Sequence, residues 1–407
     1  MAADSTAYDA VLKEIWTSDN LESQIYQDNP LLAEIEKTQR YNVGDKAITP
    51  LHVERSGGYT VVPRTGSDSL NAADPQGLNQ ATWNYTHHWF QIQVETATVD
   101  ETANKSLAVA SVVDTEVSGA VNDLRKQITR QAFSAGDGLI AKCASTTSST
   151  TVNLNTSDYG YDAIVRGWLY PGLKVDIGTT SDPTSVATGR TITAVTEDSS
   201  GPAITISGAA VSTTTSNYIS ITGSRSGSSS YEMNGLRNIV SQSAVLGGLD
   251  PASVPQWKAA AVDNTSQALA LALLYQKQRE VMQRTGEAPD WNVTSLKQQE
   301  AFYKLLQQQA RFDGDKSLGA GNVQNAHFAG MTIYGQPDCP DRHWFFLNKK
   351  NLFIVATDQP HWHNKYTGTP RIFNWTAGST RLVAGLVYRI QLATNRRNAH
   401  AALTNLS

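Results

Sequence analysis

The sequence contains few residues that form covalent cross-links or bind soft metals. Among its 407 residues are two cysteines, Cys143 and Cys339. Two cysteines so far apart define neither a disulfide framework nor a metal cluster. We therefore predict both to be reduced thiols without a chemical role.

Charged residues are also scarce. They make up 17% of the chain, and the net charge is −4, which argues against a nucleic-acid binder that works through a broad basic face. A protein that merely encloses nucleic acid is not excluded. The opening MAADSTAYDA lacks the basic and apolar regions of a signal peptide, and no run of about 18 apolar residues occurs. We expect cytoplasmic synthesis and no membrane partner.

The motifs of common catalytic sites are missing as well. No phosphate-binding loop and no H-E-x-x-H zinc motif occur. Gly319-Ala-Gly321 lacks the third glycine and the preceding strand of a dinucleotide site. Gly223-Ser-Arg-Ser-Gly227 has arginine where a hydrolase elbow needs serine. The sequence therefore predicts no catalytic residues, no cofactor and no enzyme.

Histidine and carboxylate groupings are weak as metal sites. His87-His88 are adjacent, so on a strand they face opposite sides. His361-Trp362-His363 places two imidazoles on one strand face, but Asp358 is the only nearby carboxylate, which favours a surface or interface aromatic cluster with Trp362. Asp313 and Asp315 resemble half a calcium loop without its glutamate, which favours a solvated turn. We predict no metal ligands.

One long amphipathic helix, residues 100–133, organises the chain. Asp100 is a candidate N-cap, and Gly136-Asp137-Gly138 is a candidate stop. About thirty residues give a rod of about 45 Å, longer than most globular helices. The first half is too irregular for a coiled coil, so we expect the spine of a large flat domain. The residues predicted to lie on its apolar face are Val117, Val121, Leu124, Ile128 and Ala132.

Two further regions precede this helix in the sequence. Residues 1–40 hold a helical cluster around Val11 and Trp16 and a second short helix from Pro30, capped by Asn29. These are either core helices or an arm that packs on a neighbour, and the pattern favours neither. Residues 41–99 contain strand-like runs at 47–53, 59–62 and 83–94. The polar stretch from Arg64 to Gln80 predicts a protruding hairpin that contacts another chain.

Residues 143–231 differ in composition, because serine, threonine and glycine dominate them. Alternating runs at 173–177, 191–195, 203–207 and 218–222 predict a small all-β insertion, either a sandwich or a barrel. The flanking Ser/Gly runs are expected to be flexible seams.

The remainder, residues 232–407, has a mixed α/β pattern. We predict a helix from Asn264 or Thr265 through Arg284, with Leu269, Leu273, Gln276 and Glu280 spaced along it and Gly286 closing it. A second helix over 296–311 begins after Ser295, with Leu305 and Leu306 inward. The predicted strands are 291–294, 328–335, 344–347, 352–356 and 381–393, the last with one buried face.

The order of these parts resembles the major capsid proteins of tailed bacteriophages, which have the HK97-like fold. The resemblance covers nearly the whole chain, although none of its local patterns is a sharp motif. It implies an α+β chain with an inserted small all-β domain. The implied parts are an N-terminal arm (1–40), an extended loop (41–92), a peripheral domain with the spine helix (93–142), the inserted β-domain (143–231), an axial domain (232–340) and closing strands shared by the two domains (341–407).

The resemblance implies a function as well. A subunit of this family assembles in the host cytoplasm into hexamers and pentamers of an icosahedral virion shell, which encloses double-stranded DNA without sequence-specific binding. Because the chain starts directly at the arm, the resemblance implies either a separate scaffolding protein or a segment already removed, together with a portal and, in some shells, a decoration protein. Some relatives cross-link lysine to asparagine, and Lys46 lies at the root of the extended loop. The alternatives are an encapsulin-like compartment and, from the Ser/Thr-rich island and nine tryptophans, a carbohydrate-binding surface protein.

Overall fold

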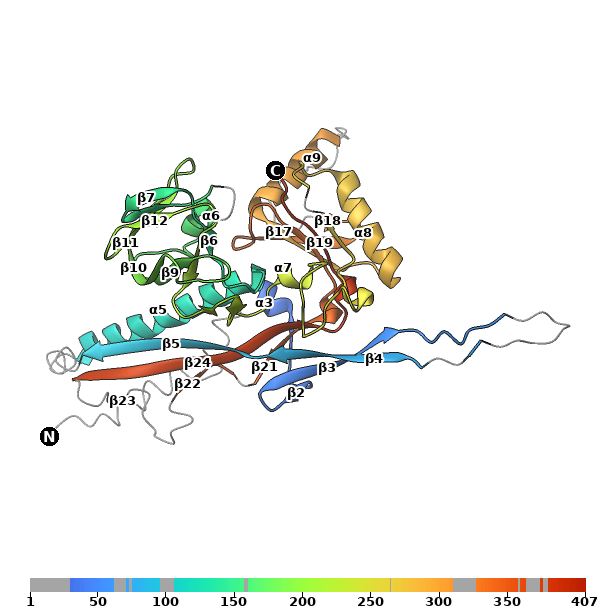
Figure 1. The fold of residues 1–407 in the computed structure, drawn as a ribbon, viewed down its shortest axis with the longest axis horizontal. Coiled ribbons are helices and arrows are strands. Elements are labelled where there is room, and N and C mark those ends of the chain that lie inside the picture. The colour runs from blue at the N-terminus through green and yellow to red at the C-terminus, as the bar shows by residue number, and fades with distance from the viewer. Residues whose placement is uncertain are drawn as a thin grey trace. The chain divides into compact units, whose positions relative to one another are not determined.

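The computed structural model describes residues 30–61, 71–72, 75–95, 106–156, 160–263, 265–309, 327–357, 359–363, 374–375 and 380–407. The chain forms two compact units (Figure 1). Unit 1 comprises Met1–Gln39, Tyr85–Gly235 and Ile354–Leu392, and unit 2 comprises Arg40–Asn84, Leu236–Phe353 and Ala393–Ser407.

A sheet and one long helix form the base of unit 1. The sheet contains β1 (Glu36–Thr38), β5 (Thr86–Glu95), β21 (Leu352–Ala356), β22 (His361–Trp362), β23 (Asn374–Trp375) and β24 (Arg381–Thr394). Strands β5 and β24 pair antiparallel from Arg381 opposite Glu95 to Ile390 opposite Thr86. Helix α5 (Ser106–Phe133) lies along β5 and β24 (Figure 1).

A long helix, α5, is present over the described part of the predicted range 100–133. It ends at Phe133, and Gly136 and Gly138 follow with φ of +71° and +72°, as a left-handed stop requires. Four of the five predicted apolar positions are buried, namely Val121, Leu124, Ile128 and Ala132. The Asp100 cap and the side chain of Val117 lie outside the described residues.

Residues 141–230 of unit 1 form a β-barrel. Its six strands follow the order β6-β13-β9-β10-β11-β8, and a bridge between Cys143 and Leu154 joins the two end strands. The bridge closes this six-stranded ring, and two further strand pairs, β7–β12 and β14–β15, lie outside it. The elements of the domain are β6 (Ala141–Lys142), β7 (Thr146–Ser149), β8 (Thr151–Asn153), α6 (Gly160–Val165), β9 (Lys174–Gly178), β10 (Ala187–Thr196), β11 (Ala203–Ile206), β12 (Val211–Thr213), β13 (Tyr218–Ile221), β14 (Arg225–Ser226) and β15 (Ser229–Ser230).

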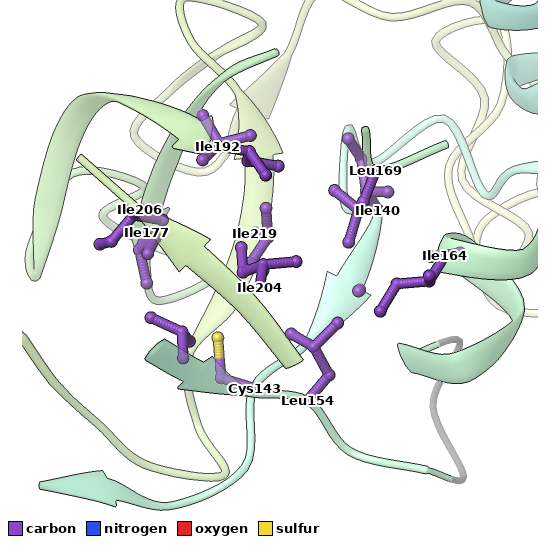
Figure 2. Close-up of a cluster of buried hydrophobic side chains, with 14 of the residues drawn as sticks. Ile140, Cys143, Leu154, Ile164, Leu169, Ile177, Ile192, Ile204, Ile206 and Ile219 are labelled. Carbon is purple, nitrogen blue, oxygen red and sulfur yellow. The ribbon is translucent and has the colours of Figure 1, made fainter. Parts of the chain in front are cut away.

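The barrel has its own apolar core, shown in Figure 2, which includes Ile177, Ile192, Ile204 and Ile219. The four predicted strands are present, but helix α6 departs from a purely β domain. The prediction of flexible seams is wrong, because the Ser/Thr runs form β7, β8 and the β14–β15 hairpin. Their hydroxyls accept backbone hydrogen bonds, for example from the amide of Asn153 to Thr146 Oγ1 at 3.0 Å.

Unit 2 contains a second six-stranded sheet, in the order β16-β25-β20-β17-β19-β18. Its strands are β16 (Ala261–Asp263), β17 (Trp291–Ser295), β18 (His327–Phe328), β19 (Met331–Gln336), β20 (Trp344–Leu347) and β25 (Ala401–Leu403). Helices α8 (Leu271–Thr285) and α9 (Leu296–Gln309) pack against it around Leu274, Phe302 and Trp344. The short elements are α3 (Pro30–Glu34) in unit 1 and α7 (Leu236–Ile239), η1 (Pro255–Trp257), η3 (Lys349–Asn351) and η4 (Arg397–Ala399) in unit 2.

The two helices of unit 2 differ from the prediction at their starts and faces. Helix α8 begins at Leu271 rather than near Thr265, whose amide donates to Asp263 Oδ1. Its buried face includes Lys277, whereas Gln276 is exposed. Gly286 closes the helix with a φ of +75°, as predicted. In α9 the predicted cap is confirmed, since Ser295 Oγ accepts from the amide of Gln298 at 3.2 Å. Phe302 is fully buried there, while Leu305 and Leu306 are partly buried.

Two strand predictions and one helix prediction need correction. The run 328–335 forms two strands, because Ala329 and Gly330 have φ of +50° and +83° and make a turn. Strand β24 is buried on both faces over its second half, where Val387 and Ala393 are as inaccessible as Leu386. The helix at Pro30 spans five residues and gives way to β1 at Glu36; Asn29 lies outside the described chain.

Unit 2 also contains a long hairpin. Strand β3 (Lys46–Glu54) pairs antiparallel with β4 (Gly77–Asn84), from Lys46 opposite Asn84 to Glu54 opposite Gly77, and β2 (Asn42–Val43) pairs with the start of β3. The predicted strand 83–94 is interrupted at Tyr85, where β4 ends and β5 follows. Residues Tyr59–Val61 are not in a strand, contrary to prediction.

Candidate functional site

The adjacent histidines face opposite sides of β5, as predicted. His88 is buried, and burial, with the nearby Arg130 and His87, lowers its pKa to about 4. His87 is exposed, and its pKa is lowered by partial burial and by Arg389. The two rings therefore cannot share a ligand.

The second histidine pair joins a different aromatic group from the one predicted. The His363 ring meets Trp89 edge-on at 4.8 Å between centroids, and Trp89 is 54% exposed. Trp362 and His361 are buried, and His361 Nδ1 lies 2.9 Å from the carbonyl of Gln359. A surface aromatic contact exists, but Trp89 rather than Trp362 supplies its indole.

The remaining candidate residues named from the sequence either have structural roles or lie outside the described residues. Arg225, within the Gly223–Gly227 run, is buried and donates to the carbonyl of Thr180 at 2.6 Å. Both cysteines are buried thiols outside any disulfide, and burial raises the pKa of Cys143 to about 12. The part of the chain that the structure describes holds no group of three metal-binding side chains. Residues outside the described ranges are Asp313, Asp315, Asp358, Gly319 and Gly321.

No described helix is both long enough and apolar enough to cross a bilayer.

The β3–β4 hairpin is the candidate interaction site. At its root, Ala47, Ala81 and Trp83 are buried, and Trp83 Nε1 donates to Thr49 Oγ1 at 3.0 Å. Farther out the same hairpin exposes large apolar side chains: Tyr59 is 81% exposed, Leu78 78% and Val61 77%. These exposed apolar groups make the hairpin the candidate contact with another macromolecule.

The outer hairpin is held by polar contacts between its two arms. Asn71 donates from its amide to Thr60 Oγ1 and from its side chain to the carbonyl of Tyr59, each at 2.9 Å. His52 Nε2 lies 2.6 Å from Gln76 Oε1. Among the described residues the only strand that pairs with β4 is β3, and at the root of the hairpin the amide of Thr82 in β4 donates to the carbonyl of Gly247 at 2.8 Å. The described part of the hairpin is thus a two-stranded ribbon that exposes apolar side chains at its outer end.

A buried anchor that the sequence did not reveal fastens the barrel to α5. Arg130 Nη2 donates to Glu232 Oε1, and both side chains are inaccessible. The next two amides, of Met233 and Asn234, donate to Gln131 Oε1 at 3.0 Å and Gln391 Oε1 at 2.7 Å. The partners lie about a hundred residues or more apart, so no local pattern signals them.

The Ser/Thr-rich island, residues 143–231, is used mainly to build the barrel. It contains a single tryptophan, Trp168, and that side chain is buried, whereas Tyr231 at the end of the island is 60% exposed. The exposed positions of β7, β8 and β10 are mostly threonine and serine.

No protein-family profile matches the chain, and no curated protein matches it in sequence. Among solved structures, it is similar to a protein of the cyanophage A-1(L) capsid asymmetric unit, with 13% identity over 93% of both chains and a TM-score of 0.55. It is also similar to the capsid of the native GTA particle (8% identity, 93% and 90% covered, TM-score 0.48). A third similarity is to the holo-SrpI encapsulin complex from Synechococcus elongatus PCC 7942 (8%, 93% and 87%, 0.43).

The similarity to the cyanophage protein is the one from which we infer the fold. It extends over nearly all of both chains, so it includes both units and not one shared motif. The identity is low, and the agreement therefore concerns the path of the backbone. The chain has the mixed α/β fold of a phage capsid protein, which confirms the resemblance predicted from the order of its parts.

Proposed function

We propose that this chain is a major capsid protein, which assembles with copies of itself into an icosahedral head shell around double-stranded phage DNA. The fold shared with the cyanophage capsid protein over 93% of both chains is the observation that supports it. The protein acts as a structural unit of the virion rather than as an enzyme, and it assembles in the host cytoplasm.

The proposed parts follow the resemblance. Helix α5 is the spine of a peripheral domain, the barrel is an inserted domain, and the sheet of unit 2 with α8 and α9 is the axial domain. The β3–β4 hairpin is the extended loop, and residues 1–40 are the N-terminal arm. Residues 341–407 supply closing strands to both domains.

The hairpin supplies the main physical reason for self-association. Tyr59, Val61 and Leu78 expose apolar surface that a neighbouring subunit would cover. Each square ångström of apolar area removed from water contributes about 25 cal/mol. Contacts of modest strength, repeated by symmetry, make a stable closed shell.

Further partners follow from a shell of this kind. We infer a separate scaffolding protein, a portal and, at some sites, a decoration protein, together with hexamers and pentamers of the chain. The net charge of −4 suits a wall that encloses DNA without binding a particular sequence.

A single substitution on the hairpin tests the proposal. Leu78→Asp places a charge where apolar contact is expected, and shells should be lost; Leu78→Met, which keeps the apolar surface, is the matched control. The measurement is electron microscopy with size-exclusion chromatography of the purified protein, with scaffolding protein supplied. A wild-type chain that stays monomeric under all these conditions would overturn the shell function. Equal shell yields for both variants would overturn the role of the hairpin.

A further inference from the structure

Arg397, in η4 of unit 2, is a fully buried cation held by backbone carbonyls. Its side chain is 0% exposed. The guanidinium donates four hydrogen bonds, to the carbonyl oxygens of Asn238 (2.8 Å), Ile239 (3.0 Å), Ala244 (2.8 Å) and Trp257 (3.3 Å).

These acceptors explain why an arginine is present. Asn238 and Ile239 end helix α7, where carbonyls lack partners within the helix and carry partial negative charge. Within the described chain no carboxylate forms an ion pair with Arg397. Burial lowers its pKa to about 10, so the group is still charged at neutral pH. A planar fork that donates in several directions fits this arrangement, whereas a single ammonium does not.

The segment that Arg397 gathers, residues 238–257, also supports the root of the hairpin. The amide of Thr82 in β4 donates to the carbonyl of Gly247 at 2.8 Å. The Trp257 ring lies 6.5 Å from that of Trp83, and its Nε1 donates to the carbonyl of Leu246 at 2.9 Å. The same segment therefore touches Arg397 at several points and β4 at two.

Gly247 makes the contact with β4 close. Its φ is +63°, and a Cβ at this position would lie 2.9 Å from the Cβ of Ala81. A larger residue would push the segment away from the hairpin, while the carbonyls that bind Arg397 lie elsewhere in the segment. One substitution can therefore disrupt the contact between Gly247 and β4, and another can remove the hydrogen bonds of Arg397, each without the other.

We propose that Arg397 is a positioning residue that fixes the direction of the β3–β4 hairpin by ordering residues 238–257 beneath its root. Its consequence for assembly rests on the proposed shell function; the positioning itself does not. Without the guanidinium, the carbonyls lose their shared donor and the segment no longer holds Gly247 and Trp257 against β4.

The test measures the hairpin direction in the unassembled subunit. Spin labels at Leu78→Cys on the hairpin and Tyr275→Cys on α8 report a distance within unit 2; both sites are exposed, and the two native cysteines are buried. Arg397→Met should broaden this distance distribution. Arg396→Met is the matched control, because Arg396 donates instead to the carbonyl of Thr285 at 2.9 Å; it should leave the distribution unchanged.

Gly247→Ala is the second variant and covers the case in which Arg397→Met does not fold. It should broaden the same distribution and speed hydrogen exchange at the Thr82 amide by about tenfold, while the Arg397 contacts remain. A folded Arg397→Met or Gly247→Ala protein with an unchanged distribution would overturn the proposal. Broadening in a chain whose wild type forms no shells would support the positioning role and count against the shell function alone.

Discussion

Arg130 in unit 1 and Arg397 in unit 2 are two of the buried arginines, and they join distant parts of the chain in different ways. Arg130 on α5 meets the carboxylate of Glu232, whereas Arg397 meets only backbone carbonyls. Each lies near a buried histidine whose pKa burial lowers to about 4, His88 beside Arg130 and His400 beside Arg397. Both arginines are thus buried beside a histidine, but among the described residues only Arg130 has a carboxylate that neutralises its charge.

The difference concerns what remains when one partner is lost. A buried ion pair leaves an uncompensated charge when either side chain is removed. A set of carbonyls leaves neutral acceptors, each of which costs less because water or a relaxed backbone can satisfy it. Removing Arg130 or Glu232 should therefore strongly destabilise the attachment of the barrel to α5 in unit 1. Removing the Arg397 guanidinium should destabilise the segment beneath the hairpin in unit 2 by a smaller amount.

The largest effect should come from breaking the ion pair. Glu232→Ala leaves the Arg130 guanidinium buried without its counter-charge, and we expect a loss of about 3–5 kcal/mol in the free energy of unfolding. Urea unfolding followed by circular dichroism measures it. Asp162→Ala is the control, because Asp162 pairs with Arg166 at 3.2 Å near the surface and its side chain is 26% exposed.

The double variant Arg130→Met with Glu232→Met sharpens the result. It removes both charges and keeps apolar volume, so it should recover more than half of the loss. A double variant as unstable as Glu232→Ala would mean that geometry, rather than the unpaired charge, sets the cost.

The second-largest effect should be a loss in the free energy of unfolding when the pH is lowered from 7 to 5. His88 and His400 titrate near pH 4 when folded and near 6.5 when unfolded, so the unfolded chain binds more protons between these values. Stability is therefore complete above about pH 6.5 and falls toward pH 4. Each histidine contributes a slope of about 1 kcal/mol per pH unit. Unfolding in urea at pH 7.0, 6.0 and 5.0 covers the part of this window above most carboxylate titrations.

The two histidines should be separable by substitution. His400 accepts from the amide of Asn348 at 3.3 Å and lies 3.2 Å from Thr394 Oγ1, whereas Nε2 of His88 has no hydrogen-bond partner among the described residues. His88→Gln should thus remove about half of the pH slope at little cost at pH 7. His400→Gln should remove a similar share but destabilise at every pH. A wild-type stability that is flat from pH 7 to 5 would contradict both assignments.

Sequence patterns predicted the elements whose signals are local. The barrel strands alternate apolar and polar residues, and the Ser295 cap and the Gly286 stop follow from short-range chemistry. The turn at Ala329 was missed because an alanine with a φ of +50° has no sequence signal. Lys277 was not expected inside: its pairing with Glu280 is local, but the second carboxylate, Asp263, comes within 3.8 Å only in the fold.

The candidate site was predictable only in outline. The polar stretch from Arg64 to Gln80 indicated a hairpin, but the exposed Tyr59, Val61 and Leu78 that give it an apolar surface lie mainly outside that stretch. The support beneath its root could not be predicted, because Arg397 binds carbonyls that every residue type carries, more than a hundred positions away. Residue identity reveals side-chain chemistry, and this contact depends on the backbone.

The smallest effect should come from Arg396, which tests whether burial rather than residue type distinguishes the buried arginines. Its side chain is 37% exposed, and it pairs with Glu287 at 3.7 Å, a distance at which solvent screens most of the attraction. Arg396→Met should change the free energy of unfolding by less than about 1 kcal/mol, and 1 M salt should weaken even that difference. Urea unfolding at low and high salt measures both. A loss comparable to that of Arg397→Met would mean that the turn carrying both residues, and not the buried guanidinium, holds this region together.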